Sequence, residues 1–215
     1  RSLQIGLGGS ASTDGGAGAL MALGLRAFDA SGRPVSPGAH GLRTVTEVDT
    51  GGLAPLPPGG VQLLVDTAAP LHGPQGAAAV FGPQKGATPA DVEQLDDGLT
   101  RWARILNAAG LHADADAPGA GAAGGAGFGL MSWGATATSG AQRISELTGL
   151  DDHLRTADLV LTGEGRLDDT SWTGKLVGHV LDAAARHGLP ALVVAGQVAG
   201  RCPVPALSLS DIAGS

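Results

Sequence analysis

One stretch, Leu159-Val-Leu-Thr-Gly-Glu-Gly-Arg-Leu-Asp168, decides the fold that we expect for this chain. An apolar run, Ala157 to Leu161, overlaps the start of this stretch and predicts a short buried strand that breaks into a loop at Gly163 and Gly165. A helical pattern resumes after Gly174. The order strand, glycine loop, helix is typical of α/β proteins, which bind ligands at the carboxyl ends of their strands. The stretch therefore predicts an α/β fold with a ligand loop.

Charged side chains are dense in this loop, although only 15% of the chain is charged. They are Glu164, Arg166, Asp168, Asp169 and Lys175. The loop is not a Walker A motif, which would need Gly at position 169 and Ser or Thr at position 176. Cations suit an anionic ligand, and carboxylates suit a metal or a proton. The alternative is a polar loop whose charges form caps and surface ion pairs.

Composition narrows the class of protein. The chain has 215 residues and is 43% hydrophobic, so it can form a core, and its 37 glycines lie between apolar runs without a strict period. This pattern indicates many tight loops rather than collagen or disorder. A net charge of −7 argues against a basic nucleic-acid-binding surface. The chain opens on Arg1 without an initiator Met, as an excerpt of a longer protein would.

The cellular compartment of the protein is suggested by features that the sequence lacks. It has no apolar run of about 18 residues, so we expect no membrane span, and it does not open on a secretory signal. The single cysteine, Cys202, cannot form an internal disulfide and excludes cysteine-based zinc sites. We expect a cytoplasmic protein that binds neither nucleic acid nor membranes.

A second strand–loop–helix pattern opens the chain. The apolar run Leu3 to Leu7 ends in Gly8-Gly-Ser-Ala-Ser-Thr-Asp-Gly-Gly16, and helical periodicity follows. Backbone N–H groups at such a helix start form an anion site, to which Ser10 adds a hydroxyl. The alternative is a helix N-terminus that is simply capped by Thr13 or Asp14.

Two further positions are candidates for chemistry. Val61 to Val65 predicts a strand that is closed by Asp66, where α/β enzymes place catalytic or metal-binding carboxylates. Lys85 lies between glycines and prolines, on a constrained loop that suits a phosphate or carboxylate ligand. The alternatives are an Asx turn or helix cap at Asp66 and a solvated surface lysine.

The remaining elements complete an α/β pattern. A strand over 189–195 follows the helix over 174–187, which predicts a parallel βαβ unit with the strand near 159. The glycine-rich run 118–129 predicts backbone packed tightly against a ligand or another element. Further predicted elements are a weak strand at 43–48 and helices at 91–109 and 141–155.

Five motifs in order resemble the bacterial glycerate kinase family, over most of residues 3 to 198. They are Gly8-Gly-Ser-Ala-Ser-Thr-Asp-Gly-Gly16, Asp66 with Pro70-Leu71, Phe81-Gly-Pro-Gln-Lys-Gly-Ala87, Pro118-Gly-Ala-Gly-Ala-Ala-Gly-Gly125, and Thr162-Gly-Glu-Gly-Arg-Leu-Asp168 with Gly174-Lys175. The resemblance implies an enzyme of two α/β domains that transfers the γ-phosphate of ATP, with Mg²⁺, to a hydroxyl of D-glycerate. The alternative is a non-catalytic or truncated ligand-binding domain that retains this scaffold.

The resemblance also implies a division of the chain. Residues 1–150 would form a mixed α/β domain rich in glycine loops, the family's middle region. Residues 151–215 would form a Rossmann-like portion with a parallel sheet. Family members carry a substantial segment before the first glycine loop, and we expect that segment, absent here, to complete the second domain.

Phosphoryl transfer needs positioned phosphates, neutralised charge and an oriented nucleophile, and the candidate residues fit these tasks. Asp66, Asp168 and Lys85 are the catalytic candidates, with either aspartate as the base and both as tentative Mg²⁺ contacts. The substrate- and nucleotide-binding candidates are Gly8, Gly9, Ser10, Gly15, Gly16, Gly163, Glu164, Arg166 and Lys175.

Overall fold

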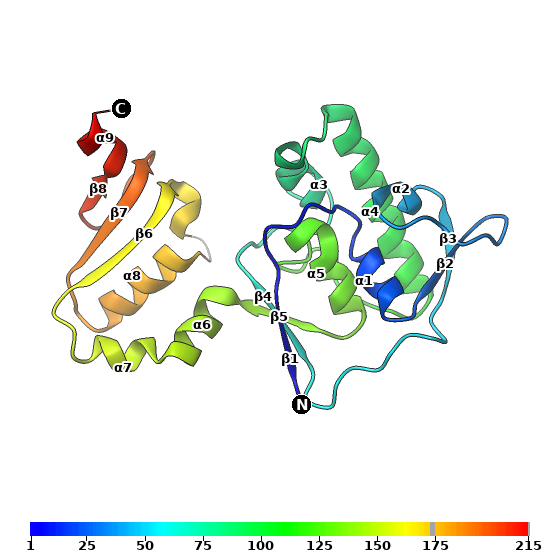
Figure 1. The fold of residues 1–215 in the computed structure, drawn as a ribbon, viewed down its shortest axis with the longest axis horizontal. Helices are drawn as coiled ribbons and strands as arrows, with labels where there is room; N and C mark the ends of the chain where they lie inside the picture. The colour runs from blue at the N-terminus through cyan, green and yellow to red at the C-terminus, as the bar shows by residue number, and fades with distance from the viewer. Residues whose placement is uncertain (173–174, 215) are drawn as a thin grey trace. The chain divides into compact units, whose positions relative to one another are not determined.

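The computed structural model describes residues 1–172 and 175–214, which form two compact units, Arg1–Thr138 (unit 1) and Ser139–Ser215 (unit 2) (Figure 1). The predicted α/β class with parallel sheets is confirmed. The sequence places the division of the chain after residue 150. The structure divides it after Thr138 because the helices over 140–154 pack against the helix over 176–186.

Unit 1 is built on a three-stranded sheet in the order β1-β4-β5, and unit 2 on one in the order β6-β7-β8. The elements of unit 1 are β1 (Leu3–Gly6), α1 (Ala17–Ala22), β2 (Arg26–Asp29), α2 (Ala39–Leu42), β3 (Val45–Asp49), β4 (Val61–Val65), α3 (Ala77–Phe81), η1 (Pro83–Lys85), α4 (Pro89–Ala108), α5 (Ala122–Ser132) and β5 (Thr136–Ser139). Those of unit 2 are α6 (Gly140–Thr148), α7 (Leu150–Leu154), β6 (Val160–Leu167), η2 (Asp169–Trp172), α8 (Leu176–Arg186), β7 (Ala191–Val198), β8 (Ala206–Ser208) and α9 (Leu209–Ala213).

β1 and β4 run parallel, so their carboxyl ends lie at the same edge of the sheet. Their register runs from Leu3 opposite Val61 to Gly6 opposite Leu64, and the Leu7 N–H extends it with a bond of 3.0 Å to the Leu64 carbonyl. β4 begins and ends where the sequence predicts. The predicted ligand loop after β1 and the predicted carboxylate after β4 therefore leave the sheet side by side.

The long helix α4 carries the core of unit 1. A capping box starts it, in which Thr88 and Asp91 each accept from the other's backbone N–H. Leu99, Trp102 and Leu106 of α4 are fully buried. They follow helical spacing, so one face of α4 faces the core, as its periodicity predicts.

The glycine-rich run 118–129 becomes the start of α5, with three residues out of helical geometry. Ala123, Gly124 and Gly125 have positive φ angles of 51°, 69° and 86°. A Cβ on Gly124 would lie 2.0 Å from the Ser12 carbonyl oxygen, closer than any real contact. The run thus packs its backbone directly on the first glycine loop, as its small residues predict.

Unit 2 contains the predicted βαβ unit, in which β6 and β7 are parallel and α8 joins them. The predicted loop at Gly163 and Gly165 is wrong, because β6 continues through both glycines to Leu167. A Cβ on Gly163 would lie 2.1 Å from the Val194 carbonyl oxygen. Glycine here allows close approach of the neighbouring strand rather than a turn. The predicted helix over 141–155 is likewise two helices, divided at Gly149.

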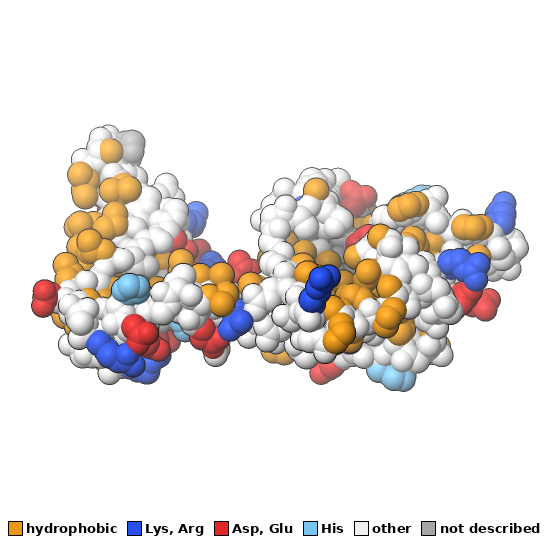
Figure 2. Space-filling view, turned by 60° about the horizontal axis from the view of Figure 1, so that its bottom comes forward, with side chains coloured by type: hydrophobic (Ala, Val, Ile, Leu, Met, Phe, Trp, Pro, Cys, Tyr) orange, Lys and Arg blue, Asp and Glu red, His pale blue; other side chains and the backbone are white. Residues whose placement is uncertain are grey.

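One face of the unit 2 sheet is covered by α8, and the other is open. Val177 and Leu181 of α8 pack on Val193 of β7. On the opposite face Leu161 is 63% exposed and Leu207 45% exposed. Figure 2 shows hydrophobic side chains gathered on this part of unit 2. Parallel sheets normally have both faces covered, so the exposure of these leucines among the described residues is unusual.

Among the described residues, no helix combines the length and apolar character that a bilayer crossing requires.

Candidate functional site

A cavity of about 200 Å³ opens at the carboxyl ends of β1 and β4. This is the edge at which parallel α/β sheets bind ligands. The lining residues come from four separate segments: Leu7, Gly8, Gly9 and Ser10; Asp66 and Thr67; Phe81, Gln84 and Lys85; and Ala123 and Gly124. The structure thus brings Gly8, Gly9, Ser10, Asp66 and Lys85 of the predicted site around one cavity, the Gly8–Lys85 cavity.

Lys85 is held by the short helix η1 rather than by a flexible loop. The Lys85 N–H donates to the Gly82 carbonyl at 2.9 Å, and the next two amides close the turn on Pro83 and Gly82. Gly86 then ends the helix in the left-handed region, at φ 91°. The backbone of Lys85 is therefore fixed on both sides.

The side chain of Lys85 reaches across the cavity to the first glycine loop. Its Nζ donates to the Ser10 hydroxyl at 3.0 Å and to the Ser12 carbonyl at 2.5 Å. Burial lowers the pKa of Lys85 from its ordinary value, and the negative charge of Asp14 partly opposes this effect. The ammonium group is thus a partly desolvated cation beside the loop, where it can attract an oxyanion.

Asp14 is the buried carboxylate of this loop, and it supports the start of α1. Its carboxylate accepts from the Gly16 N–H at 3.1 Å and from the Gly18 N–H at 3.0 Å. The sequence offers Thr13 or Asp14 as the cap of this helix, but the N-cap position is taken by Gly16, so neither residue is the cap. Asp14 instead supports the first turn from two residues before the N-cap.

Gly15 and Gly16 differ from the other predicted loop residues because they are buried and their amides are already bonded. The Gly15 N–H donates to the Gly124 carbonyl at 3.0 Å, and the Gly16 N–H donates to Asp14. The indole Nε1 of Trp102 donates to the Gly15 carbonyl at 3.1 Å. We therefore assign both glycines to packing between the loop, α4 and α5, and not to ligand contact.

Asp66 is exposed at the rim of the cavity, directly after β4. No hydrogen bond or ion pair joins its carboxylate to any other described residue. Neither of the alternatives for Asp66, an Asx turn or a helix cap, is therefore present. Its neighbour Thr67 instead accepts from the Ala69 N–H, at 3.1 Å.

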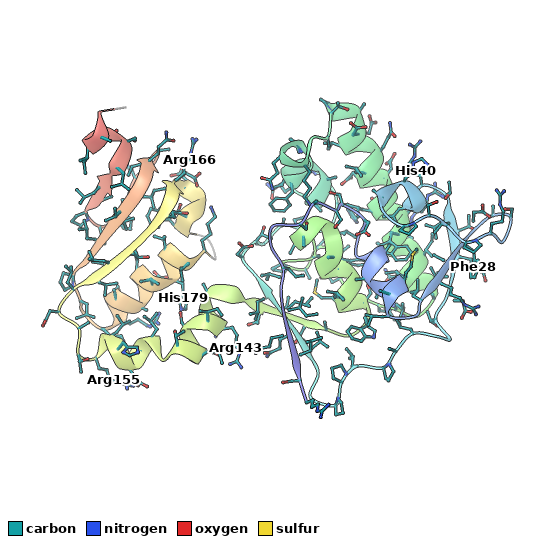
Figure 3. All side chains as sticks on the ribbon, viewed as in Figure 1. Phe28, His40, Arg143, Arg155, Arg166 and His179 are labelled. Carbon is teal, nitrogen blue, oxygen red and sulfur yellow. The ribbon has the colours of Figure 1, made fainter. Side chains whose placement is uncertain are left out.

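The candidate residues of unit 2 lie along the carboxyl half of β6. Arg166 and Asp168 form a long ion pair, with 3.9 Å between Nε and Oδ2. Figure 3 shows Arg166 at the end of β6 that leads into η2. Oε1 of Glu164 is buried and has no hydrogen-bond partner among the described residues. Such an orphaned oxygen is uncommon in native proteins.

Lys175 immediately precedes α8, and Gly174 lies outside the described residues. No group of three or more His, Cys, Asp or Glu side chains in the described ranges is arranged to hold a metal ion.

Sequence reasoning did not assign Thr67, Phe81, Gln84, Ala123 or Gly124 to the site. Each of these residues lies in or beside one of the five motifs, so the motifs already indicate which segments form the site. Which motif residues face the cavity depends on turn geometry, and above all on the positive φ of Ala123, which the sequence does not display.

Comparisons with known proteins place these motifs in context. A family model described as the glycerate kinase family matches residues 1–208. The chain is 41% identical to a "Glycerate 2-kinase" of Escherichia coli (strain K12), over 90% of this chain and 51% of that protein. It is 39% identical to a "Glycerate kinase" of Bacillus subtilis (strain 168), over 91% of this chain and 52% of that protein.

A crystal structure named for a glycerate kinase 2 from Salmonella typhimurium LT2 is similar in fold, with a TM-score of 0.74 and 41% sequence identity. The match covers 93% of this chain and 56% of that one. The chain spans about half the length of the curated relatives it matches.

Proposed function

This chain belongs to the glycerate kinase family, and from that premise we propose that the protein containing it transfers the γ-phosphate of ATP to a hydroxyl of D-glycerate. The observation that carries the proposal is the Gly8–Lys85 cavity, in which a fixed cation, a glycine loop and an unpaired carboxylate converge. The name of the Escherichia coli relative favours the 2-hydroxyl as the acceptor. We place the reaction in the cytoplasm, where ATP is supplied.

The size of the cavity favours the small acid as its occupant. Its volume of about 200 Å³ lies below the roughly 300 to 1,000 Å³ of pockets that hold drug-sized ligands. A three-carbon hydroxy acid fits this space, whereas a whole nucleotide does not. We therefore assign glycerate, together with the phosphoryl group it receives, to unit 1.

Charge neutralisation in the cavity falls to Lys85. Its ammonium group can exchange the Ser12 carbonyl for an oxyanion of the substrate and keep its bond to Ser10. A charge-assisted bond of this kind is roughly twice as strong as a neutral one. The backbone N–H groups of Gly8 and Gly9 can donate to the same anion, because both residues are exposed at the cavity wall.

Asp66 is our candidate for the general base. A kinase base accepts the proton of the attacking hydroxyl and orients it toward phosphorus. Asp66 meets the structural condition, because its carboxylate lies at the cavity rim without a protein partner in the described chain. Asp168 remains the alternative from unit 2.

We assign the nucleotide phosphates to residues of unit 2. Arg166 and Lys175 supply cations at the carboxyl end of β6 and the start of α8, and Gly163 and Glu164 lie on the same strand. Anions bind well at such an edge because strand ends and helix N-termini present backbone donors.

Mg²⁺ fits the donors that are present. Magnesium usually keeps several waters and takes one or two carboxylates together with substrate phosphates. Asp66 of unit 1 is a hard oxygen donor of this kind, and so, within unit 2, are Asp168 and the orphaned oxygen of Glu164. When bound, the ion would neutralise charge on the transferring phosphoryl group.

We also propose that the open face of the unit 2 sheet is covered, in the intact protein, by the segment that family members carry before the first glycine loop. The exposure of Leu161 and Leu207 supports this. Leu161→Lys should leave the stability of the 215-residue chain unchanged but destabilise the intact protein, as denaturant unfolding of both would show. Equal tolerance in both proteins would argue against the proposal.

The test of function is phosphorylation by the intact gene product. With ATP, Mg²⁺ and D-glycerate we expect ADP release and a phosphorylated acid, which ³¹P NMR identifies. Asp66→Asn should lower kcat about 10²- to 10⁴-fold, as loss of a general base does. Asp116→Asn, at an exposed turn on the same unit, is the matched control.

A folded intact protein that fails to phosphorylate D-glycerate would overturn the kinase proposal. Calorimetry would then test the alternative, a non-catalytic ligand-binding domain. Binding of glycerate and nucleotide without turnover would support that alternative.

A further inference from the structure

A second hollow of unit 1 lies between β3 and α4, and it shares no lining residue with the Gly8–Lys85 cavity. We name it the β3–α4 groove. Its volume is about 520 Å³, within the usual range for small-molecule sites. β3 packs against α4 here, so the groove follows the seam between the two elements (Figure 1).

One stripe of α4 forms a wall of this groove. Arg101, Arg104, Ile105 and Ala108 all line it, at positions i, i+3, i+4 and i+7 of the helix. Helical spacing places such residues on one face. The stripe therefore joins two guanidinium groups to an apolar strip, and Val48 of β3 faces it from the other wall.

The two arginines of the groove are exposed, and no other side chain of the described residues holds their guanidinium groups. In the same unit, Arg26 pairs with Asp49, Arg33 with Asp29, and Arg43 with Gln94. Within residues 1–172 and 175–214, neither Arg101 nor Arg104 makes a hydrogen bond or ion pair.

The nearest carboxylates do not neutralise this pair. Glu47 lines the groove from β3, and Asp97 precedes Arg101 by one helical turn, yet neither forms an ion pair with the arginines. The groove thus concentrates two cations against one lining carboxylate, on a chain whose net charge is −7.

We propose that the β3–α4 groove binds a small organic oxyanion, a phosphate ester or carboxylate that carries an apolar body. Arg101 and Arg104 take the oxyanion, because guanidinium groups match carboxylate and phosphate oxygens in geometry and charge. Ile105 and Val48 pack on the apolar body. The site is separate from the proposed kinase site.

The groove lies next to a residue of α4 that supports the first glycine loop. Arg101 precedes Trp102, whose indole holds the Gly15 carbonyl. One turn of α4 therefore carries both an arginine of the groove and a side chain that contacts the loop of the Gly8–Lys85 cavity.

Phenyl phosphate, which combines a ring with an oxyanion, is the probe. We expect saturable shifts of the Arg101 and Arg104 Nε–H resonances of the ¹⁵N-labelled chain at constant ionic strength. Inorganic phosphate, which lacks the ring, and phenol, which lacks the charge, should each bind about tenfold more weakly or worse.

Variants locate the binding. R101Q/R104Q should weaken phenyl phosphate binding about tenfold or more, as followed by the backbone amide resonances of Val48 and Ile105, because two charge-assisted contacts are lost. Arg33→Gln, an exposed arginine elsewhere on unit 1, should leave it unchanged, and so should Lys85→Met in the other cavity. Glu47→Gln should strengthen binding by removing the competing carboxylate, a gain that no folding defect can imitate.

Three results would overturn the proposal. They are absence of saturable shifts up to about 10 mM probe, binding that R101Q/R104Q leaves intact, and binding that Lys85→Met abolishes. The last would place the probe in the Gly8–Lys85 cavity instead.

Discussion

The ammonium group of Lys85 donates a hydrogen bond of 3.0 Å to the hydroxyl of Ser10, a residue 75 positions earlier in the chain. This bond joins η1 to the loop after β1. It fixes a cation at the wall of the cavity that Gly8 and Gly9 also line. The Lys85 side chain is therefore positioned before any ligand arrives, which would lower the ordering cost of the anion binding that we propose.

Removal of this cation should abolish most glycerate binding. Lys85→Met keeps much of the side-chain length but loses a charge-assisted bond, so we expect affinity to fall about 10- to 150-fold. Calorimetry of D-glycerate binding to the 215-residue chain measures this. Gln84→Met, a neighbouring substitution at the cavity wall, is the control. A Lys85→Met affinity within twofold of the parent would show that the acid binds elsewhere.

As pH rises, glycerate binding should weaken at a lower pH than it would if Lys85 had the ordinary pKa of a lysine. Burial lowers the pKa of Lys85, so the ammonium form that binds the acid is lost earlier as pH rises. Lys85→Arg should remove this alkaline limb, because arginine stays charged. Asp14→Asn should move it to still lower pH, because the charge of Asp14 raises the Lys85 pKa. Dissociation constants measured across the alkaline range test both shifts.

The same shift has a consequence for stability. The unfolded chain holds the Lys85 proton more tightly than the folded chain does. Between the lowered folded pKa and the ordinary unfolded value, the contribution of Lys85 to the free energy of unfolding therefore rises with pH. Lys85→Met should remove this contribution, which urea titrations at several alkaline pH values would reveal.

A methyl group on Gly124 should destabilise unit 1 through two effects. Gly124→Ala strains a backbone at φ 69° and forces the new Cβ against the Ser12 carbonyl, 2.0 Å away. Gly86→Ala is the matched control, because Gly86 has φ 91° but open space around its Cβ position. We expect Gly124→Ala to cost about 1–3 kcal/mol more than the control in urea unfolding. Equal costs would mean that the contact relaxes freely.

The indole of Trp102 should matter more than that of Trp133. Trp102→Phe leaves the buried Gly15 carbonyl without its donor, at a cost of about 1–3 kcal/mol. Trp133 donates to Ala54 at 2.7 Å, but Ala54 is exposed and water can replace the indole. Trp133→Phe should therefore cost no more than about 1 kcal/mol. Unfolding of the two variants, followed by circular dichroism, compares them directly.

Much of the architecture was predictable because the apolar runs and the turn residues between them indicate the same helices and strands. Val61 to Val65 and the βαβ unit around α8 show this. The approach of Ser10 to Asp66 was also predictable, because parallel strands end at one edge, whereas Lys85 reaches the same cavity from η1, which follows no strand.

What the sequence could not predict depends on tertiary contacts of glycine. Gly163 in a strand and Gly8 in a loop have the same local appearance, and only the approach of β7 distinguishes them. Likewise, the amides of Gly15 and Gly16 are loop donors by sequence, yet Gly124 and Asp14 already accept from them. Contacts of this kind join residues far apart, which local periodicity does not record.

The seating of Gly124 on the Ser12 carbonyl has a practical meaning for engineering. The backbone of Gly124 packs on the backbone of Ser12 there, so side-chain substitutions cannot move this wall of the cavity. A mutant library that aims at new acceptor acids should therefore leave these glycines unchanged. Substitutions are better placed at Thr67, Phe81 and Gln84, which line the same cavity and take no part in that backbone contact.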